Sequence, residues 1–230
     1  MIKNLCSPRL LLSASAILLF VLSIKSQSFT YFPANNKLTV GRLGYTATVL
    51  PNSTAIVAGG TSNNVYLANT ELYDLAGGTW TETGLMNVAR YDHQAILLSD
   101  GKVLVTGGYG KNGYLTNTEC YDPKNGTWTE TSGMKTPRND FLMTQLANRQ
   151  VLVAGGKDGF RTLASAELFN PDTGQWTQTG SMKEACTGAY VIDWLPTGQI
   201  LVAHGKNRAG LTITNELYDP TSGQWTLRNP

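Results

Sequence analysis

The chain has 230 residues, of which 41% are hydrophobic, and carries 18 Lys and Arg against 16 Asp and Glu, for a net charge of +2. A chain so close to neutral lacks the basic excess typical of nucleic-acid-binding proteins, so we expect no nucleic-acid partner. Its three cysteines are too few for a disulfide scaffold, which excludes the small disulfide-rich class.

Residues 1–28 differ from the rest of the chain in the order of their residue types. The basic residues Lys3 and Arg9 precede an apolar run at 10–24, and small and polar residues follow at 25–28. This order is typical of a secretory signal peptide and predicts a secreted, extracellular protein. If the segment is not cleaved, it predicts an N-terminal membrane anchor, although the run is shorter than the roughly 20 residues that span a bilayer. Without residues 1–28 the chain has 15 basic and 16 acidic side chains, a net charge of −1.

After a lead-in at 29–41, four similar units follow one another at spacings of 48 or 49 residues: 42–89, 90–137, 138–185 and 186–230. A repeat of this length is typical of solenoids and propellers. Each unit has a glycine pair or its variant, then a Glu eleven residues later, then a Trp. We expect a structural role for these repeated residues: Gly59, Gly60, Gly107, Gly108, Gly155, Gly156, Gly205, Glu71, Glu119, Glu167, Glu216, Trp80, Trp128, Trp176 and Trp225.

The second unit predicts four short strands, at about 93–98, 102–106, 117–121 and 127–131. Turn residues at 99–101 and 122–126 separate the first two strands and the last two. This pattern predicts an antiparallel meander and an all-β fold. Such a sheet cannot bury both faces alone, so the copies are expected to stack around an axis. The Trp supplies a large buried area, and the glycine pair allows close approach of the backbone.

The second unit also carries a motif that resembles the kelch repeat, whose copies form the blades of β-propellers. The residues that carry the resemblance are Gly107, Gly108, Leu115, Glu119, Tyr121, Asp122, Pro123, Trp128, Met134 and Arg138. Their counterparts extend it over residues 42–228, apart from Leu75 in place of Pro, His204 in place of Gly and Cys186 in place of Arg. The resemblance implies a β-propeller of four kelch-type, four-stranded antiparallel blades. A closed ring, an open arc, and an arc completed by self-association with a second chain all remain open.

In such a meander, the longer connections and the links between blades share one face, which we take as the candidate binding face. Its mixed aromatic and basic residues suit an acidic peptide or the polar groups of a glycan. The candidates are Arg42, Arg90, Arg138, Tyr66, Tyr109, Tyr114, Lys157, Asp158, Phe160, Arg161, Lys206, Asn207 and Arg208. Because the three arginines recur at one repeat position, an alternative is that they hold the link between blades by bonding to carbonyl groups. The resemblance implies that kelch propellers bind peptides on this kind of face.

Catalysis has little support in the sequence. The only histidines are His93 and His204, and no cluster has metal-ligand spacing, so we expect no metal and no cofactor. The repeated Glu is expected to make hydrogen bonds within each blade rather than to act as a general acid. The sequence therefore predicts a secreted module that binds a protein, peptide or glycan. The alternatives are a carbohydrate-active enzyme, such as one resembling galactose oxidase, and a structural assembly module.

Two turns match the N-glycosylation pattern. Asn52 and Asn125 each begin an Asn-x-Thr sequence in a predicted turn. They are candidate glycosylation sites if the host is a eukaryote.

Overall fold

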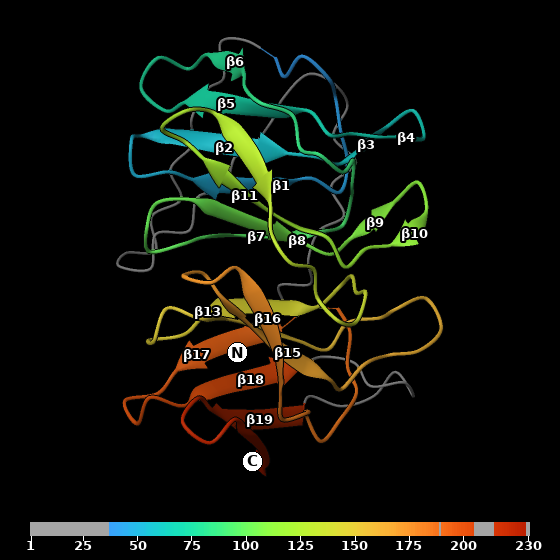
Figure 1. Ribbon diagram of the computed structural model, residues 1–230, viewed down its shortest axis with the longest axis vertical. Helices are drawn as coiled ribbons and strands as arrows, with labels where there is room; N and C mark the ends of the chain where they lie inside the picture. Colours follow the sequence, from blue (N-terminus) through green and yellow to red (C-terminus); the bar gives the residue numbers. More distant parts are fainter. Residues whose placement is uncertain (1–36, 189, 205–213, 229–230) are drawn as a thin grey trace, which may run out of the picture.

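A computed structural model of the protein describes residues 37–188, 190–204 and 214–228. The predicted signal peptide and Gly205 lie outside these residues. The described chain forms four four-stranded antiparallel sheets, each from one repeat, and two small hairpins (Figure 1). Among the described residues, no helix has the length and apolar character needed to cross a membrane.

In each sheet the four strands lie side by side in the order in which they occur in the chain. The first sheet consists of β1 (Thr46–Val49), β2 (Thr54–Ala58), β5 (Thr70–Asp74) and β6 (Trp80–Glu82). The second consists of β7 (Gln94–Leu97), β8 (Val103–Thr106), β11 (Thr118–Asp122) and β12 (Thr127–Glu130). The third consists of β13 (Leu142–Gln145), β14 (Val151–Ala154), β15 (Ala166–Asn170) and β16 (Gln175–Thr179). The fourth consists of β17 (Tyr190–Trp194), β18 (Ile200–His204), β19 (Thr214–Asp219) and β20 (Gln224–Arg228).

The four sheets are the blades of a β-propeller, and they follow one another in an arc. The first and fourth blades lie at opposite ends of the long axis (Figure 1). Buried hydrophobic clusters join the first blade to the second, the second to the third, and the third to the fourth. Among the described residues, no such cluster joins the fourth blade to the first. The described residues therefore form an open arc rather than a closed ring, and completion of the arc by a second chain stays a prediction.

Both faces of an internal blade are buried, because alternate residues point to opposite neighbours. In the second blade, Val103, Val105 and Trp128 pack in the cluster shared with the first blade. Leu104 and Cys120 pack in the cluster shared with the third blade. This two-sided burial explains why the second strand of each repeat is continuously apolar rather than alternating.

The glycine pair is required where two repeats meet. Gly107 has a positive φ of 66°, and a Cβ there would lie 2.5 Å from the carbonyl oxygen of Arg138 in the next repeat. Gly108 has a φ of 88°, and a Cβ there would lie 2.6 Å from the carbonyl oxygen of Tyr91. Any larger residue would meet both a strained backbone and a collision. These contacts agree with the structural role that the sequence predicts for the pair.

The repeated Trp links neighbouring blades. Each indole packs on an aromatic ring of its own blade, as Trp128 does on Tyr121 with ring centroids 5.2 Å apart. The Nε1–H of Trp128 donates to Thr70 Oγ1 of the first blade at 3.3 Å, and that of Trp176 donates to Thr118 Oγ1 at 3.0 Å. In the third blade this threonine position holds Ala166.

Without that hydroxyl, the junction between the third and fourth blades lacks one hydrogen bond. Trp225 is only 1% exposed, and its Nε1 is buried without a hydrogen-bond partner in the described part of the chain. An unsatisfied buried donor of this kind is destabilising, by about 1–3 kcal/mol.

We predict that Ala166→Thr, which copies the sister repeats, stabilises the protein by supplying an acceptor to Trp225. The matched control is Ala166→Val, because valine has nearly the shape of threonine without the hydroxyl. In urea unfolding, the threonine variant is expected to be more stable than the valine variant by about 1 kcal/mol. Equal stabilities would contradict the proposed hydrogen bond.

Candidate functional site

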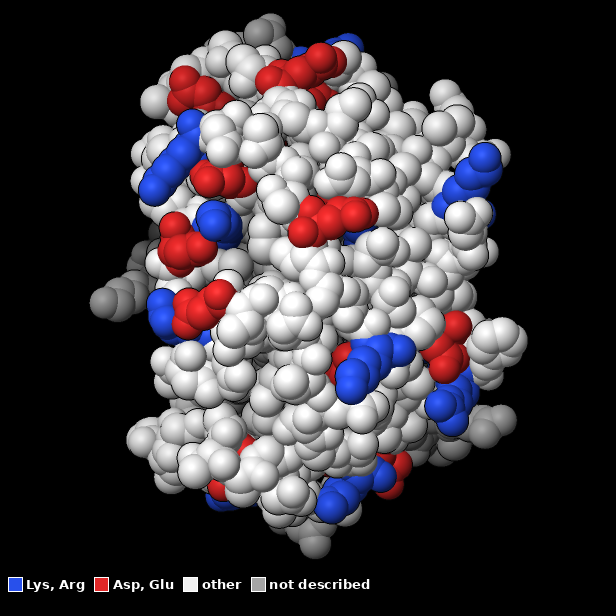
Figure 2. Space-filling model, viewed as in Figure 1, with Lys and Arg blue, Asp and Glu red and all other residues white. Residues whose placement is uncertain are grey.

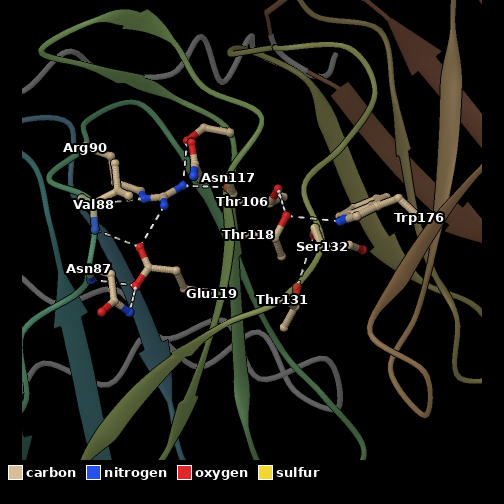
Figure 3. A network of polar contacts seen from close by, with 11 residues as sticks. Asn87, Val88, Arg90, Thr106, Asn117, Thr118, Glu119, Thr131, Ser132 and Trp176 are labelled. Carbon is tan, nitrogen blue, oxygen red and sulfur yellow. Dashed lines mark hydrogen bonds and ion pairs between the residues drawn. The ribbon is translucent and has the colours of Figure 1, made fainter.

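The predicted binding arginines lie inside the blades, as the second repeat shows (Figure 3). The Arg90 guanidinium donates to Glu119 Oε1 at 2.8 Å, to the carbonyl oxygen of Asn117 at 2.8 Å and to that of Gly107 at 3.1 Å. Glu119 in turn accepts from the backbone N–H of Asn87 at 2.6 Å and of Val88 at 3.1 Å. One buried ion pair therefore ties the link that enters the blade to both central strands of that blade.

The first and third repeats use the same arrangement. Arg42 pairs with Glu71 and Arg138 with Glu167, and the side chains of all three arginines are 0% exposed. A guanidinium so buried cannot reach a partner, so the prediction that Arg42, Arg90 and Arg138 bind a ligand is wrong. The alternative, in which they hold the link between blades by bonding to carbonyls, is what the structure shows.

The fourth repeat keeps the glutamate but replaces the arginine. Glu216 accepts from the backbone N–H of Lys183 at 2.8 Å and of Glu184 at 3.0 Å, and Cys186 occupies the arginine position as a fully buried side chain. All four repeated glutamates are buried and hydrogen-bonded, in agreement with the role in the blades that the sequence predicts.

The predicted binding face is assembled from the longer connections. In the first two repeats these form short hairpins, β3 (Thr61–Ser62) with β4 (Val65–Tyr66) and β9 (Tyr109–Gly110) with β10 (Gly113–Tyr114), which project on the same side of the arc (Figure 1). In the first three repeats, isolated bridges join the connection to the link that precedes its blade, as Tyr91 pairs with Tyr109. We call this side, with its hairpins and links, the loop face.

Four tyrosines form one patch on the loop face, and we call them the tyrosine patch: Tyr66, Tyr91, Tyr109 and Tyr114. Tyr66 and Tyr91 are stacked with ring centroids 5.5 Å apart and an angle of 1° between planes. Tyr109 lies between the others, with centroids 6.1 Å from Tyr66, 5.8 Å from Tyr91 and 5.1 Å from Tyr114. Three predicted residues thus come together with one that the sequence reasoning missed.

The missed residue, Tyr91, had a signal in the repeats. Its position holds Leu43, Asn139 and Thr187 in the other units, so the blade itself does not need an aromatic ring there. Burial raises the pKa of Tyr91, and the neighbouring Asp92 carboxylate adds to the effect. Comparing the exposed repeat positions for departures from the consensus would have identified it.

The charged candidates of the third repeat pair with each other or with neighbours. Lys157 Nζ lies 2.9 Å from Asp140 Oδ2, and Arg161 Nε lies 3.5 Å from Asp158 Oδ2. Phe160, at the tip of this connection, is 97% exposed. Lys206, Asn207 and Arg208 lie outside the described residues. Among the described candidates of the loop face, the tyrosines are therefore aromatic neighbours and the charged side chains are paired.

His93 serves the junction between the first two blades. It is 3% exposed, its Nε2 lies 2.8 Å from Thr46 Oγ1, and its Nδ1 is buried without a hydrogen-bond partner in the described chain. Burial, reinforced by Arg90, lowers the pKa of His93 from 6.5 to about 3. The His93 ring is therefore neutral and packs at the junction between the blades. Only the backbone of His204 is described. Among the described residues, no group of three His, Cys, Asp or Glu side chains could hold a metal ion.

The opposite face carries the tight turns. A hollow of about 420 Å³ between the first two blades is lined by Pro51, Asn52, Asp100, Gly101, Lys102, Asp122, Pro123 and Lys124. Figure 2 shows small groups of both signs along the edge formed by these turns, with no extended patch of one sign on the side in view. Asn52 and Asn125 are exposed on this face, which leaves glycosylation there a prediction. The balanced charge of the hollow selects no particular ligand.

We predict that Arg90→Met destabilises the protein by about 3–5 kcal/mol, because it leaves the Glu119 carboxylate buried without its cation. Glu119→Leu is expected to have a similar effect. In the double variant the free-energy loss should fall well below the sum of the two, since neither charge remains unpaired. Urea unfolding of the four proteins measures this coupling, and additive losses would show that the pair does not act as a unit.

We also predict a pH dependence of stability that His93 causes. Its folded pKa of about 3 lies below its ordinary value of 6.5, so the unfolded chain takes up the proton first. The stability from the neutral ring is complete above pH 6.5 and is lost as the pH falls toward 3, by about 2 kcal/mol between pH 7 and 5. His93→Phe copies Phe141 of the sister repeat and should lose less stability over this interval. Parallel pH profiles for the two proteins would contradict the assignment.

Comparison with known proteins agrees with this architecture. The model of the KLHDC2/KLHL20/DRC7 Kelch-repeats domain matches residues 13–205, which is most of the chain. A search of curated proteins gave no match. Kelch-repeat domains of this type are typically protein-binding modules and generally have no enzymatic activity. With its repeated Gly-Gly, Glu and Trp positions built into four-stranded blades, the chain belongs to the kelch-repeat family.

Proposed function

We propose that this chain is a binding module that recognises a protein through its loop face, with the tyrosine patch at the centre of the contact. The observation that carries the proposal is the convergence of four aromatic rings from the connections of two repeats and the link between them. A rigid blade scaffold holds these connections in place, as expected where loops carry function.

The chemistry of the patch suits a protein interface. All four tyrosines are partly exposed. Among the described residues, none of the four phenol oxygens has a hydrogen-bond partner in the protein. Tyrosine combines a large apolar ring with a polar tip and is enriched where proteins meet. Rings already fixed by their neighbours lose little side-chain entropy when a partner binds.

The family supports a protein as the partner, since kelch-repeat domains generally bind proteins. An extracellular location is predicted from residues 1–28, which lie outside the described residues. Glycan binding and self-association also stay predictions beside the proposed protein partner. With Arg42, Arg90 and Arg138 buried and Lys157 and Arg161 paired with aspartates, the described candidates offer less support for an acidic ligand.

We predict that Tyr109→Ala weakens partner binding by about 2 kcal/mol or more, as expected for a central aromatic contact. The Tyr91–Tyr109 bridge is made by backbone atoms at 2.9 and 3.0 Å, so the substitution should leave the hairpin intact. The purified chain would be used to capture proteins, with mass spectrometry to identify them and titration to measure the affinity of each.

The matched control is Trp194→Ala, which removes a 50% exposed aromatic ring at the end of β17, beside a tight turn. Both variants are first shown by thermal unfolding to be folded. Loss of a partner in the Tyr109 variant alone supports the loop face. Loss in the Trp194 variant alone, or equal capture by both, would contradict it.

A further inference from the structure

The links on the loop face carry two carboxylates, at a position where the other two repeats have glycine. Asp92 and Asp140 each precede the first strand of a blade, and Gly44 and Gly188 hold the same position in the other repeats. All four residues have positive φ, at 62° for Gly44, 51° for both aspartates and 98° for Gly188. Because L-residues are disfavoured in this conformation and glycine is not, glycine would serve the turn at least as well.

Backbone hydrogen bonds place each aspartate next to the glycine at the same position of a neighbouring repeat. The N–H of Asp92 donates to the carbonyl oxygen of Gly44 at 2.8 Å, and that of Gly188 donates to the carbonyl oxygen of Asp140 at 3.2 Å. The Asp92 carboxylate reaches back over the first repeat, since a Cβ on Gly44 would lie 2.7 Å from Asp92 Oδ1 and 3.1 Å from Tyr91 Cδ2. Asp92 is therefore beside the tyrosine patch.

Asp140 already pairs with a cation of the protein, the side chain of Lys157. Lys157 Nζ lies 2.9 Å from Asp140 Oδ2. The hydrogen bond to Asp140 raises the pKa of Lys157, and the charges of Asp140, Tyr114 and Asp92 contribute. The Tyr114 ring borders this group, because a Cβ on the neighbouring Gly159 would lie 2.6 Å from its Cε2 atom. Lys157 is thus paired with Asp140, beside the Tyr114 ring, and Asp92 is close enough to act on it through its charge.

We propose that Asp92 and Asp140, with the rings of Tyr91 and Tyr114, receive an Arg or Lys side chain of the protein partner. Carboxylates form charge-assisted hydrogen bonds to such a group, and the tyrosine faces attract it through their quadrupoles. Lys157 is the resident cation, with which the incoming side chain competes. The inference rests on the proposed function. It predicts a basic group of the partner at this face, where the sequence predicted an acidic peptide or a glycan.

The test uses fluorescently labelled octapeptides of arginine, of citrulline and of glutamate, titrated against the full chain at low and high salt. The arginine peptide should bind most tightly and should weaken with salt, because the contact is ionic. Asp92→Asn and Asp140→Asn remove the charge but keep a residue that tolerates positive φ, and each should weaken binding about five- to tenfold. Asp92→Gly, which copies the sister repeats, should fold and bind as weakly as Asp92→Asn.

Two further variants separate this site from general attraction between charges. Asp172→Asn removes a 64% exposed carboxylate that pairs with Arg149 on the tight-turn face, so it should leave binding unchanged. Lys157→Met removes the resident cation and should tighten binding of the arginine peptide severalfold. Preferred binding of the glutamate peptide, or equal binding by Asp92→Asn and Asp172→Asn, would overturn the proposal.

The captured partner distinguishes this inference from the proposed function. If Tyr109→Ala loses the partner while Asp92→Asn and Asp140→Asn retain it fully, the loop face binds a protein but the cationic contact is wrong. If all three variants retain the partner, the proposed function itself fails.

Discussion

The buried ion pair between the repeated Arg and Glu is the interaction on which the rest of the structure depends. Arg90 and Glu119 lie at the point where the link from one blade enters the next, and together they bind carbonyl groups and backbone N–H groups from three segments of chain. A buried charge is costly unless it is fully paired and hydrogen-bonded, so the pair holds these segments in one geometry. The same pair in three repeats gives the arc a rigid inner framework.

That framework leaves the loop face free to differ between repeats. Glycine pairs and Trp–Thr hydrogen bonds hold neighbouring blades close together, while the tips of the connections project beyond these contacts. Tyr91 and Tyr109 occupy positions where the other repeats hold different residues, whereas Tyr66 recurs as Tyr114 and Asp92 recurs as Asp140. Residues common to all the repeats are those that pack the blades, and the proposed binding residues are found in only one or two of them.

The candidate site was only partly predictable from the sequence. Tyr66, Tyr109 and Tyr114 were identified because the topology brings their connections to one face, and the structure places them within one patch. Tyr91 was missed, since it lies in a short link rather than in a long connection. For the arginines the sequence left two readings open, ligand binding or bonding to carbonyls of the link, because a long side chain on a link can point outward or inward with the same sequence pattern.

By itself, the sequence determined the number of repeats, the strands of each blade, and the structural roles of the Gly, Glu and Trp positions. It could do so because the same local environment occurs in each repeat, so a residue type that recurs at one position in all four repeats is expected to have a packing role. Only the tertiary structure decided that the described blades form an open arc rather than a closed ring, that the arginines are buried against Glu71, Glu119 and Glu167, and that four tyrosines meet on the loop face. These outcomes depend on where acceptors and neighbours lie in space, and spacing along the chain does not contain that information.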